Sequence, residues 1–134
     1  MPSWESWHWD FDDRTPIYRQ IVLRFSRAFV RGEIPPGERV PSIREMSALL
    51  RVNTNTVQRA YQELEREAMI GSRRGTGYFF TEDETMLDNT RHALALESLQ
   101  RFVEEMRALG CKDEDILGEL TAYMKGDARH DADA

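Results

Sequence analysis

Cysteine, histidine and long hydrophobic runs are scarce in this sequence, and each scarcity excludes a class of protein. The 134 residues include one cysteine, Cys111, so no disulfide can form within the chain. The three histidines (His8, His92 and His130) are too scattered to indicate a metal site, and we expect no metal or other cofactor. No apolar run reaches the roughly 18 residues of a membrane span, and the N-terminus is acidic and aromatic, unlike a signal peptide. These features predict a cytoplasmic protein with no membrane partner.

Groupings of residues that support catalysis are also missing. The sequence has no Ser-His-Asp or Cys-His arrangement, and Gly75-Thr76-Gly77 lacks the lysine of a phosphate-binding loop. The length allows one compact domain with an appended element, which excludes a second large catalytic domain. We therefore predict that the protein is not an enzyme.

Charges of opposite sign are separated along the chain. The net charge is -6, although residues 1–81 carry 12 arginines against 10 acidic side chains, and residues 82–134 carry 6 basic against 14 acidic ones. Within residues 39–74, seven arginines stand against four glutamates. Because a local basic face governs phosphate binding more than the net charge does, this distribution permits binding to nucleic acid.

The N-terminal region combines an aromatic segment with a first helix. Aromatic residues alternate with the two-residue period of a strand at Trp7, Trp9 and Phe11. This pattern predicts a short strand or an extended arm that packs on the body. Thr15 as N-cap and Pro16 at the first helical position predict a helix start, and Gly32 is placed to end that helix. The apolar face of this helix is expected at Ile17, Ile21, Phe25 and Phe29.

Two further helices are expected to be joined by a short turn. The prolines of residues 34–37 predict a turn that redirects the chain. Ser42 and Glu45 have the spacing of a capping box, which predicts a helix from Ile43 to about Leu50. Asn53 can cap the next helix. Its expected apolar positions are Val57, Ala60, Tyr61, Leu64 and Ala68. Helices separated by so short a turn indicate a helix-turn-helix motif.

A β-hairpin is expected after these helices. Residues 69–80 contain two short β-prone runs on either side of a Gly-Thr-Gly turn. The glycine lets the backbone turn tightly and approach a phosphate or the minor groove of DNA. We predict DNA contacts from the residues of this turn: Arg73, Arg74, Gly75 and Thr76. The order of elements predicts a winged helix-turn-helix domain over residues 1–81.

The remaining sequence is acidic and strongly helical. A helix from about Asp83 to Gly110 has an apolar face at Leu94, Leu99, Phe102, Val103, Met106 and Leu109. Asp113 can cap a last helix with apolar residues at Ile116, Leu117, Leu120, Tyr123 and Met124.

Two amphipathic helices in about 45 residues bury little surface by themselves, so a partner is needed. We predict that residues 82–126 form a two-helix dimerisation or effector element and that residues 127–134 are a disordered tail. The residues expected to pack across a two-fold axis are Leu94, Leu99, Phe102, Met106, Ile116 and Leu120.

The second helix of a helix-turn-helix motif enters the major groove of DNA, where side chains near its N-terminus contact base edges. In this sequence those side chains are Asn53, Thr54, Asn55, Thr56 and Gln58. Asparagine and glutamine can pair bidentately with adenine, so we expect Asn55 and Gln58 to favour A·T pairs. Arg44 is placed to contact phosphate or guanine. Arg59 either contacts DNA or pairs with Glu63.

Three segments together resemble the GntR family of winged-helix DNA-binding domains: Pro16–Ile21, Pro36–Glu45 and Asn55–Glu65. The resemblance covers residues 11–81, and the short two-helix remainder is similar to the YtrA-type subfamily. It implies DNA contacts at Arg44, Thr54, Asn55, Thr56, Gln58, Arg74 and Gly75. Family members commonly have a turn glycine at the position of Arg51, which implies a positive φ there. Alternatively, Arg51 supplies an extra phosphate contact.

The resemblance also implies a dimer that binds a palindromic operator, with C-terminal helices that mediate dimerisation and are too small for the usual effector pocket. Members often control transporter operons and their own genes. We predict a sequence-specific transcriptional regulator, acting as a dimeric repressor on an inverted-repeat operator in double-stranded DNA. An unknown inducer, or a signal carried by the C-terminal region, is expected to change the spacing of its two DNA-binding domains.

Two alternatives assign the function to the C-terminal helices. In the first, the acidic C-terminal region engages another protein and DNA affinity is vestigial. In the second, a cavity between those helices binds a small molecule. A steep fall of DNA affinity with salt separates the DNA-binding hypothesis from the first alternative, and ligand-dependent melting tests the second.

Overall fold

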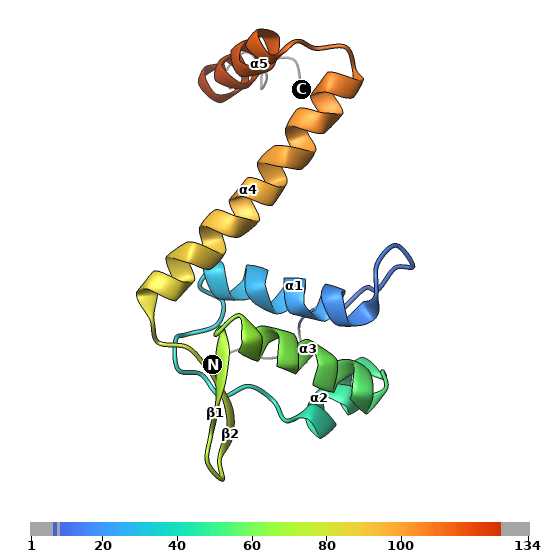
Figure 1. Cartoon of the computed structure of the whole chain (residues 1–134), viewed down its shortest axis with the longest axis vertical. Helices are drawn as coiled ribbons and strands as arrows, with labels where there is room; N and C mark the ends of the chain where they lie inside the picture. Colours follow the sequence, from blue (N-terminus) through green and yellow to red (C-terminus); the bar gives the residue numbers. More distant parts are fainter. Residues whose placement is uncertain (1–6, 8, 127–134) are drawn as a thin grey trace. The chain divides into compact units, whose positions relative to one another are not determined.

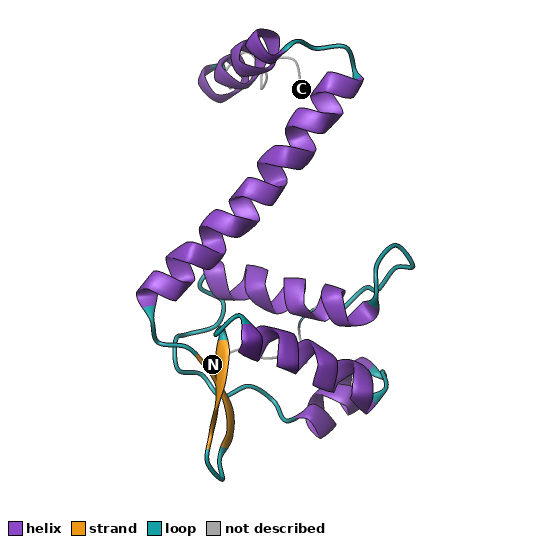
Figure 2. Ribbon diagram, in the orientation of Figure 1, coloured by secondary structure: helices purple, strands orange, loops and turns teal. Residues whose placement is uncertain are grey.

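The computed structural model describes residues 7 and 9–126, and Figures 1 and 2 show its helices, strands and loops. The chain divides into two compact units, unit 1 (Met1–His92) and unit 2 (Ala93–Ala134). The predicted disordered tail, residues 127–134, lies outside the described residues.

The elements are, in chain order, α1 (Ile17–Val30), α2 (Ile43–Leu50), α3 (Thr54–Arg66), β1 (Ile70–Arg73), β2 (Gly77–Phe80), α4 (Glu84–Ala108) and α5 (Asp113–Lys125). This order confirms the predicted fold class: a mainly α chain with a small β-hairpin, in which a winged helix-turn-helix is followed by two helices.

Helix α1 begins one residue later than the sequence predicted. Pro16, with φ -57° and ψ 143°, occupies the N-cap position, so the assignment of Thr15 as N-cap is wrong. The Pro16 carbonyl accepts the backbone N–H groups of Arg19 and Gln20. The Gln20 side-chain amide donates to the Thr15 and Asp12 carbonyls at 2.8 and 2.9 Å. Gln20 therefore holds the entry loop, and no side-chain cap is made at the helix start.

Helix α3 is the centre of unit 1, because it contacts α1, α2 and β1. The predicted core positions of α1 and α3 are buried at Ile21, Phe25, Phe29, Val57, Ala60, Tyr61 and Leu64. Ile17, in the first turn of α1, is 37% exposed. Each large side chain that is fully buried stabilises the fold by about 1.5–3 kcal/mol. These seven predicted core positions are confirmed.

Tyr61 connects the elements that surround α3. Its ring lies 6.2 Å from that of Phe25 in α1 and 5.6 Å from that of Tyr78 in β2. Its hydroxyl donates a hydrogen bond of 2.7 Å to the Pro41 carbonyl, just before α2. Burial raises the pKa of Tyr61, so the hydroxyl stays protonated and remains a donor.

The N-terminal aromatic segment is an arm and not a strand. Trp9 and Phe11 lie outside any strand, and the hairpin sheet contains only β1 and β2 among the described residues. The Trp7 and Trp9 rings lie 5.7 and 5.8 Å from the Phe25 ring, and the Arg24 guanidinium lies 4.2 Å from the Trp7 ring centre. Contacts between rings therefore fix this segment without backbone pairing.

The hairpin follows α3 through a sharp turn. Helix α3 ends at Arg66, and Ala68 is exposed with φ 60°, so its prediction as an apolar position of this helix is wrong. Met69 is buried in its place. β1 and β2 pair antiparallel in the register Ile70↔Phe80, and the predicted hairpin is confirmed.

Helix α4 begins in unit 1 and continues into unit 2. The Asp83 carboxylate accepts the Thr85 N–H at 2.9 Å. Leu87 packs against the core of unit 1, and the Arg91 guanidinium donates to the Val30 carbonyl at the end of α1, at 3.0 Å. The first turns of α4 are thereby attached to α1.

Unit 2 contains the rest of α4, a turn and α5. Gly110 has φ 89° and follows the end of α4. Lys112, and not Asp113, is the N-cap of α5, because the Asp113 carboxylate instead accepts two hydrogen bonds of 3.0 Å from Arg107. This ion pair joins the end of α4 to the start of α5. No helix in the described part of the chain is long and apolar enough to cross a membrane.

The turn between α2 and α3 contains the positive φ that the sequence resemblance implied. Arg51 has φ 58° and ψ 44°, and both its N–H and that of Val52 donate to the Ser47 carbonyl. A left-handed conformation is unfavourable for a residue with a Cβ atom. Arg51 therefore introduces local strain at the turn that sets the angle between the two helices.

Replacing Arg51 tests this strain. We expect Arg51→Gly to be more stable than Arg51→Ala by about 1 kcal/mol, because only glycine adopts this φ without strain. Urea denaturation of the two variants measures the difference, and the comparison removes any effect of losing the arginine side chain itself. At an ordinary helical φ, the alanine variant would be more stable than the glycine variant. A more stable Arg51→Ala variant therefore contradicts the left-handed conformation at residue 51.

Candidate nucleic-acid interface

The N-terminal end of α3 presents polar side chains to solvent. Asn53 caps the helix as predicted, and its side-chain oxygen accepts the Asn55 N–H at 2.7 Å. Asn53, Thr54, Asn55 and Gln58 are exposed, and Thr56 is half-buried. Since Val57 and its helical neighbours are buried on the opposite face, these polar residues are directed away from the core. The predicted residues of α3 thus form one polar surface.

Arg44 lies in the first turn of α2 and is exposed. The capping box predicted beside it is present: the Ser42 hydroxyl accepts the Glu45 N–H at 3.0 Å, and the Glu45 carboxylate accepts the Ser42 N–H at 3.1 Å. The pKa of Glu45 lies below its ordinary value, mainly because of its bonds with Ser42 and to a smaller extent because of Arg39. The fixed helix start therefore gives the backbone of Arg44 a defined position.

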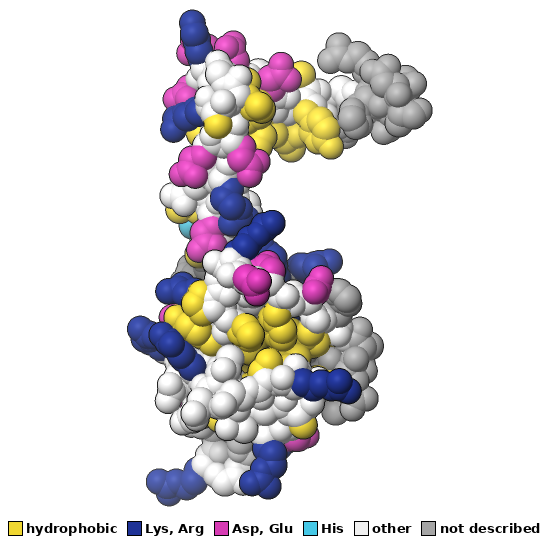
Figure 3. All heavy atoms as spheres, turned by 90° about the vertical axis from the view of Figure 1, so that its right-hand side faces the viewer, with side chains coloured by type: hydrophobic (Ala, Val, Ile, Leu, Met, Phe, Trp, Pro, Cys, Tyr) yellow, Lys and Arg dark blue, Asp and Glu magenta, His cyan; other side chains and the backbone are white. Residues whose placement is uncertain are grey.

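The tip of the hairpin is formed by exposed residues around Gly75. Gly75 has φ 75°, a value that residues with a Cβ atom rarely adopt. The Thr76 N–H and hydroxyl both donate to the Arg73 carbonyl. Arg74 and Thr76 are exposed. Basic side chains lie at the lower end of unit 1, where the hairpin ends (Figures 1 and 3).

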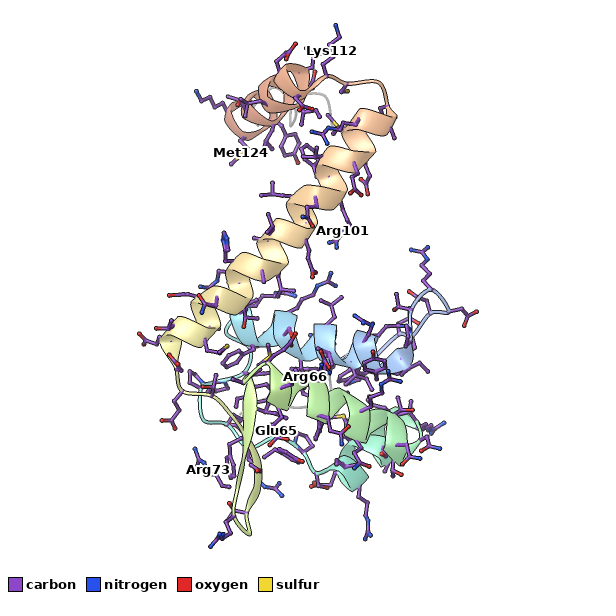
Figure 4. The ribbon with its side chains drawn as sticks, viewed as in Figure 1. Glu65, Arg66, Arg73, Arg101, Lys112 and Met124 are labelled. Carbon is purple, nitrogen blue, oxygen red and sulfur yellow. The ribbon has the colours of Figure 1, made fainter. Side chains whose placement is uncertain are left out.

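Arg73 is held along the hairpin and does not extend from its tip. Its guanidinium lies 4.1 Å from the centre of the Phe79 ring and 3.7 Å from the Glu82 carboxylate. Figure 4 labels Arg73 beside the two strands. The arginine is nevertheless 55% exposed, so it remains accessible to a ligand.

Arg59 is exposed, but it does not form the alternative ion pair that we considered for it. Glu63 pairs with Arg66, and the Arg59 guanidinium lies 4.1 Å from the centre of the Tyr18 ring of α1. The spacing of Arg59 and Glu63 was correct for a helical pair, but Arg66 and the aromatic ring provide better-placed partners. The stacking leaves Arg59 beside the polar end of α3.

Arg39 is not among the predicted DNA contacts, and a phosphate contact from Arg51 was left open; both residues are exposed in the helix-turn-helix and wing region. Arg39 forms an isolated backbone bridge with Phe79 of β2. This bridge joins residues 40 positions apart in sequence, and no local pattern indicates it. The structure confirms the positive φ implied for Arg51 and leaves its side chain exposed.

A helix-turn-helix that packs on a third helix and is followed by a basic hairpin defines a winged-helix DNA-binding protein. Residues 17–80 match the family model described as bacterial regulatory proteins, gntR family. The chain is 38% identical to the uncharacterised HTH-type transcriptional regulator YhcF of Bacillus subtilis, over 87% of this chain and 96% of YhcF. It is 33% identical to the HTH-type transcriptional repressor YtrA of the same organism, over 87% of this chain and 93% of YtrA.

A solved structure agrees with these relatives. A GntR family transcriptional regulator from Listeria monocytogenes superposes with a TM-score of 0.75 and 38% identity, covering 83% of this chain and 97% of the other. The chain therefore belongs to the GntR family of DNA-binding transcriptional regulators and is of the YtrA type. Its relatives regulate transcription and are not enzymes, which confirms the prediction from sequence.

The capping box at the start of α2 gives a pH-dependent prediction. A carboxyl group whose pKa is lowered in the folded state contributes stability above its unfolded pKa, which is close to 4.5, and loses it as the pH falls through the folded pKa. We expect wild-type protein to be more stable than Glu45→Gln at pH 7 and this advantage to shrink below about pH 4. Urea denaturation at both pH values measures the change, and an advantage independent of pH contradicts it.

Proposed function

We propose that the protein is a dimeric, cytoplasmic transcriptional repressor that binds an inverted-repeat operator. In this proposal residues 1–81 bind DNA and residues 82–126 form the dimerisation and effector element. Family membership supports DNA binding, and the relative YtrA is named a repressor. The observation that carries the proposal is the exposed polar end of α3, held by a buried core on the opposite face.

DNA recognition in this proposal depends on α3 and on the residues around it. The N-terminal end of α3 enters the major groove, where Asn55 and Gln58 pair with adenine. Arg44 contacts phosphate or guanine from the start of α2. The remaining proposed contacts come from the cap, the helix and the wing: Asn53, Thr54, Thr56, Arg59, Arg73, Arg74, Gly75 and Thr76.

Dimerisation in this proposal uses the apolar side chains that unit 2 leaves exposed. Leu99 is 51% exposed and Leu117 is 67% exposed. Met124, labelled on α5 in Figure 4, is 68% exposed. Hydrophobic side chains are visible on the surface of unit 2 in Figure 3. Large exposed apolar side chains grouped on two helices are typical of an interface.

The six residues proposed for this interface differ in burial. Leu94, Phe102, Met106 and Leu120 are half-buried, and Leu99 is exposed. Ile116 is only 6% exposed within a single chain. In the proposed dimer, Ile116 therefore supports α5 from within its own unit, while the more exposed residues meet the partner.

Regulation in this proposal acts through unit 2. An unidentified inducer changes the spacing of the two DNA-binding domains, and the regulated genes are a transporter operon and the repressor's own gene. Helix α4 is shared by both units, and its first turns are attached to α1 through Arg91 and Leu87. This continuity supports a role for α4 in transmitting the change.

The proposed base contacts can be tested by selecting operators from a random duplex library. We expect the double variant Asn55→Ala, Gln58→Ala to lose preference for A·T pairs, because each bidentate pair contributes about 1–3 kcal/mol of discrimination. Gln100→Ala, at an exposed position of α4, is the matched control and is expected to keep the wild-type preference. An unchanged preference in the double variant removes the proposed role of these two side chains.

The proposed interface can be tested by placing a charge in it. We expect Leu99→Glu to convert the dimer to a monomer, because a carboxylate at an apolar interface loses its hydration without gaining a partner. Gln100→Glu adds the same charge at the next, exposed position and is expected to remain dimeric. Light scattering coupled to size-exclusion chromatography measures the mass of each. A monomeric wild-type protein at micromolar concentration contradicts the proposal.

A further inference from the structure

The hairpin of unit 1 is widened by a third segment of backbone. The Val40 N–H donates to the Tyr78 carbonyl, and the Phe80 N–H donates to the Glu38 carbonyl, both at 2.9 Å. Arg39, between them, is the bridge partner of Phe79. The loop before α2 is therefore fixed along β2 on the side opposite to β1.

The side chains of this three-segment sheet are divided between two faces. Phe80 is buried in the core, and the Tyr78 ring contacts Tyr61, so these two residues of β2 face inward. Because successive side chains of a strand alternate, Gly77 and Phe79 face outward. Arg39 is paired with Phe79, and Arg73 is paired with Gly77, so both arginines belong to the outward face.

Gly77 leaves space between these two arginines. A Cβ atom placed on Gly77 would lie 3.9 Å from both Nε and one terminal nitrogen of Arg39. On the other side of β2, the Arg73 guanidinium lies over the Phe79 ring at 4.1 Å. The outward face thus carries the Arg39 guanidinium beside Gly77 and the Arg73 guanidinium over Phe79.

Each of these arginines has an acidic neighbour that does not bind it tightly. Arg39 is 3.8 Å from the Glu45 carboxylate, and Arg73 is 3.7 Å from the Glu82 carboxylate. Both distances exceed those of a charge-assisted hydrogen bond, which are about 2.7–2.9 Å. The side chains of Arg39 and Glu45 are 54% and 61% exposed, so solvent weakens their attraction. A phosphate group can therefore displace the carboxylate from Arg39.

We propose that Arg39 is a further DNA-contact residue, which binds a backbone phosphate next to Arg73 on the outward face of the wing, and that Glu45 competes with DNA for it. This inference rests on the proposed function, in which the wing lies against DNA. Arg39 contributes no base specificity, because a guanidinium bound to a phosphate does not contact a base. It links the start of α2, where Arg44 lies, to the wing.

The salt dependence of DNA binding tests this contact. The probes are a 30-base-pair duplex of random sequence and an operator obtained by selection. We expect Arg39→Ala to weaken binding to both roughly tenfold. The slope of log K against log salt concentration should become shallower by about 1.8, because each subunit of the proposed dimer loses one phosphate contact and one contact accounts for about 0.9. Arg39→Lys keeps the charge and is expected to retain most of the slope.

Arg31→Ala is the matched control for charge. Arg31 follows α1, is 69% exposed, and is 3.7 Å from the Glu33 carboxylate, so it resembles Arg39 in exposure and pairing but lies outside the hairpin and the helix-turn-helix. We expect its slope to equal that of the wild type. Thermal melting of each variant verifies that the fold is intact.

Competition by Glu45 is tested by a double-mutant cycle. Glutamine also serves in a capping box, so Glu45→Gln removes the charge and keeps the helix start. We expect Glu45→Gln to tighten binding severalfold when Arg39 is present and much less in the Arg39→Ala background. Equal gains in both backgrounds overturn the competition.

The failures of the two proposals can be distinguished. If wild-type protein binds DNA with a steep slope but Arg39→Ala has the wild-type slope, or if Arg31→Ala lowers the slope equally, the inference is wrong and the proposed function stands. If the wild-type protein binds neither duplex at low salt, the proposed function is wrong and the inference fails with it.

Discussion

The burial of Tyr61 in α3 is the constraint on which the rest of unit 1 depends. Its ring packs against Phe25 of α1 and Tyr78 of β2, and its hydroxyl bonds the Pro41 carbonyl before α2. One side chain of α3 therefore contacts α1, β2 and the loop that leads into α2. Because a buried hydroxyl without a partner costs about 1–3 kcal/mol, the contact also fixes the position of the Pro41 loop. Packing of this buried face therefore sets the orientation of the exposed face of α3.

An acidic protein can bind DNA when its arginines are placed where the fold brings them to one surface. Arg39 and Arg73 are each about 4 Å or less from a carboxylate, and Arg59 lies over an aromatic ring. These arrangements reduce repulsion among the arginines in the absence of DNA and cost little to disrupt, since exposed ion pairs contribute only about 0–1 kcal/mol. In the proposed competition, the Glu45 carboxylate lowers non-specific affinity without abolishing the basic surface. Weaker non-specific binding then favours an operator that also offers base contacts.

The sequence predicted most of unit 1 because its signals are local. Ser42, Glu45 and Asn53 are caps whose partners lie within three residues, and the structure contains all of their bonds. The errors arose where a nearby group took the place of the expected one. Gln20 holds the loop before the helix that Thr15 was expected to cap, Arg107 binds the carboxylate of Asp113, and Met69 is buried where Ala68 was expected. The polar residues of α3 could be identified by spacing, but the outward face shared by Arg39 and Arg73 depends on a bridge between distant segments.

The predicted apolar residues of unit 2, unlike those of unit 1, are mostly left unburied within a single chain. The predicted apolar face of α4 exists as a periodic pattern, yet no residue of α4 is buried, and Leu109 is 78% exposed. Two helices provide too little surface to enclose a core of their own. In the proposed dimer, the same leucines are buried by a second chain, so the folding of this unit is coupled to association. A repressor built in this way joins its two DNA-binding domains only above the concentration at which dimers form, and operator occupancy then depends on how much of the protein the cell contains.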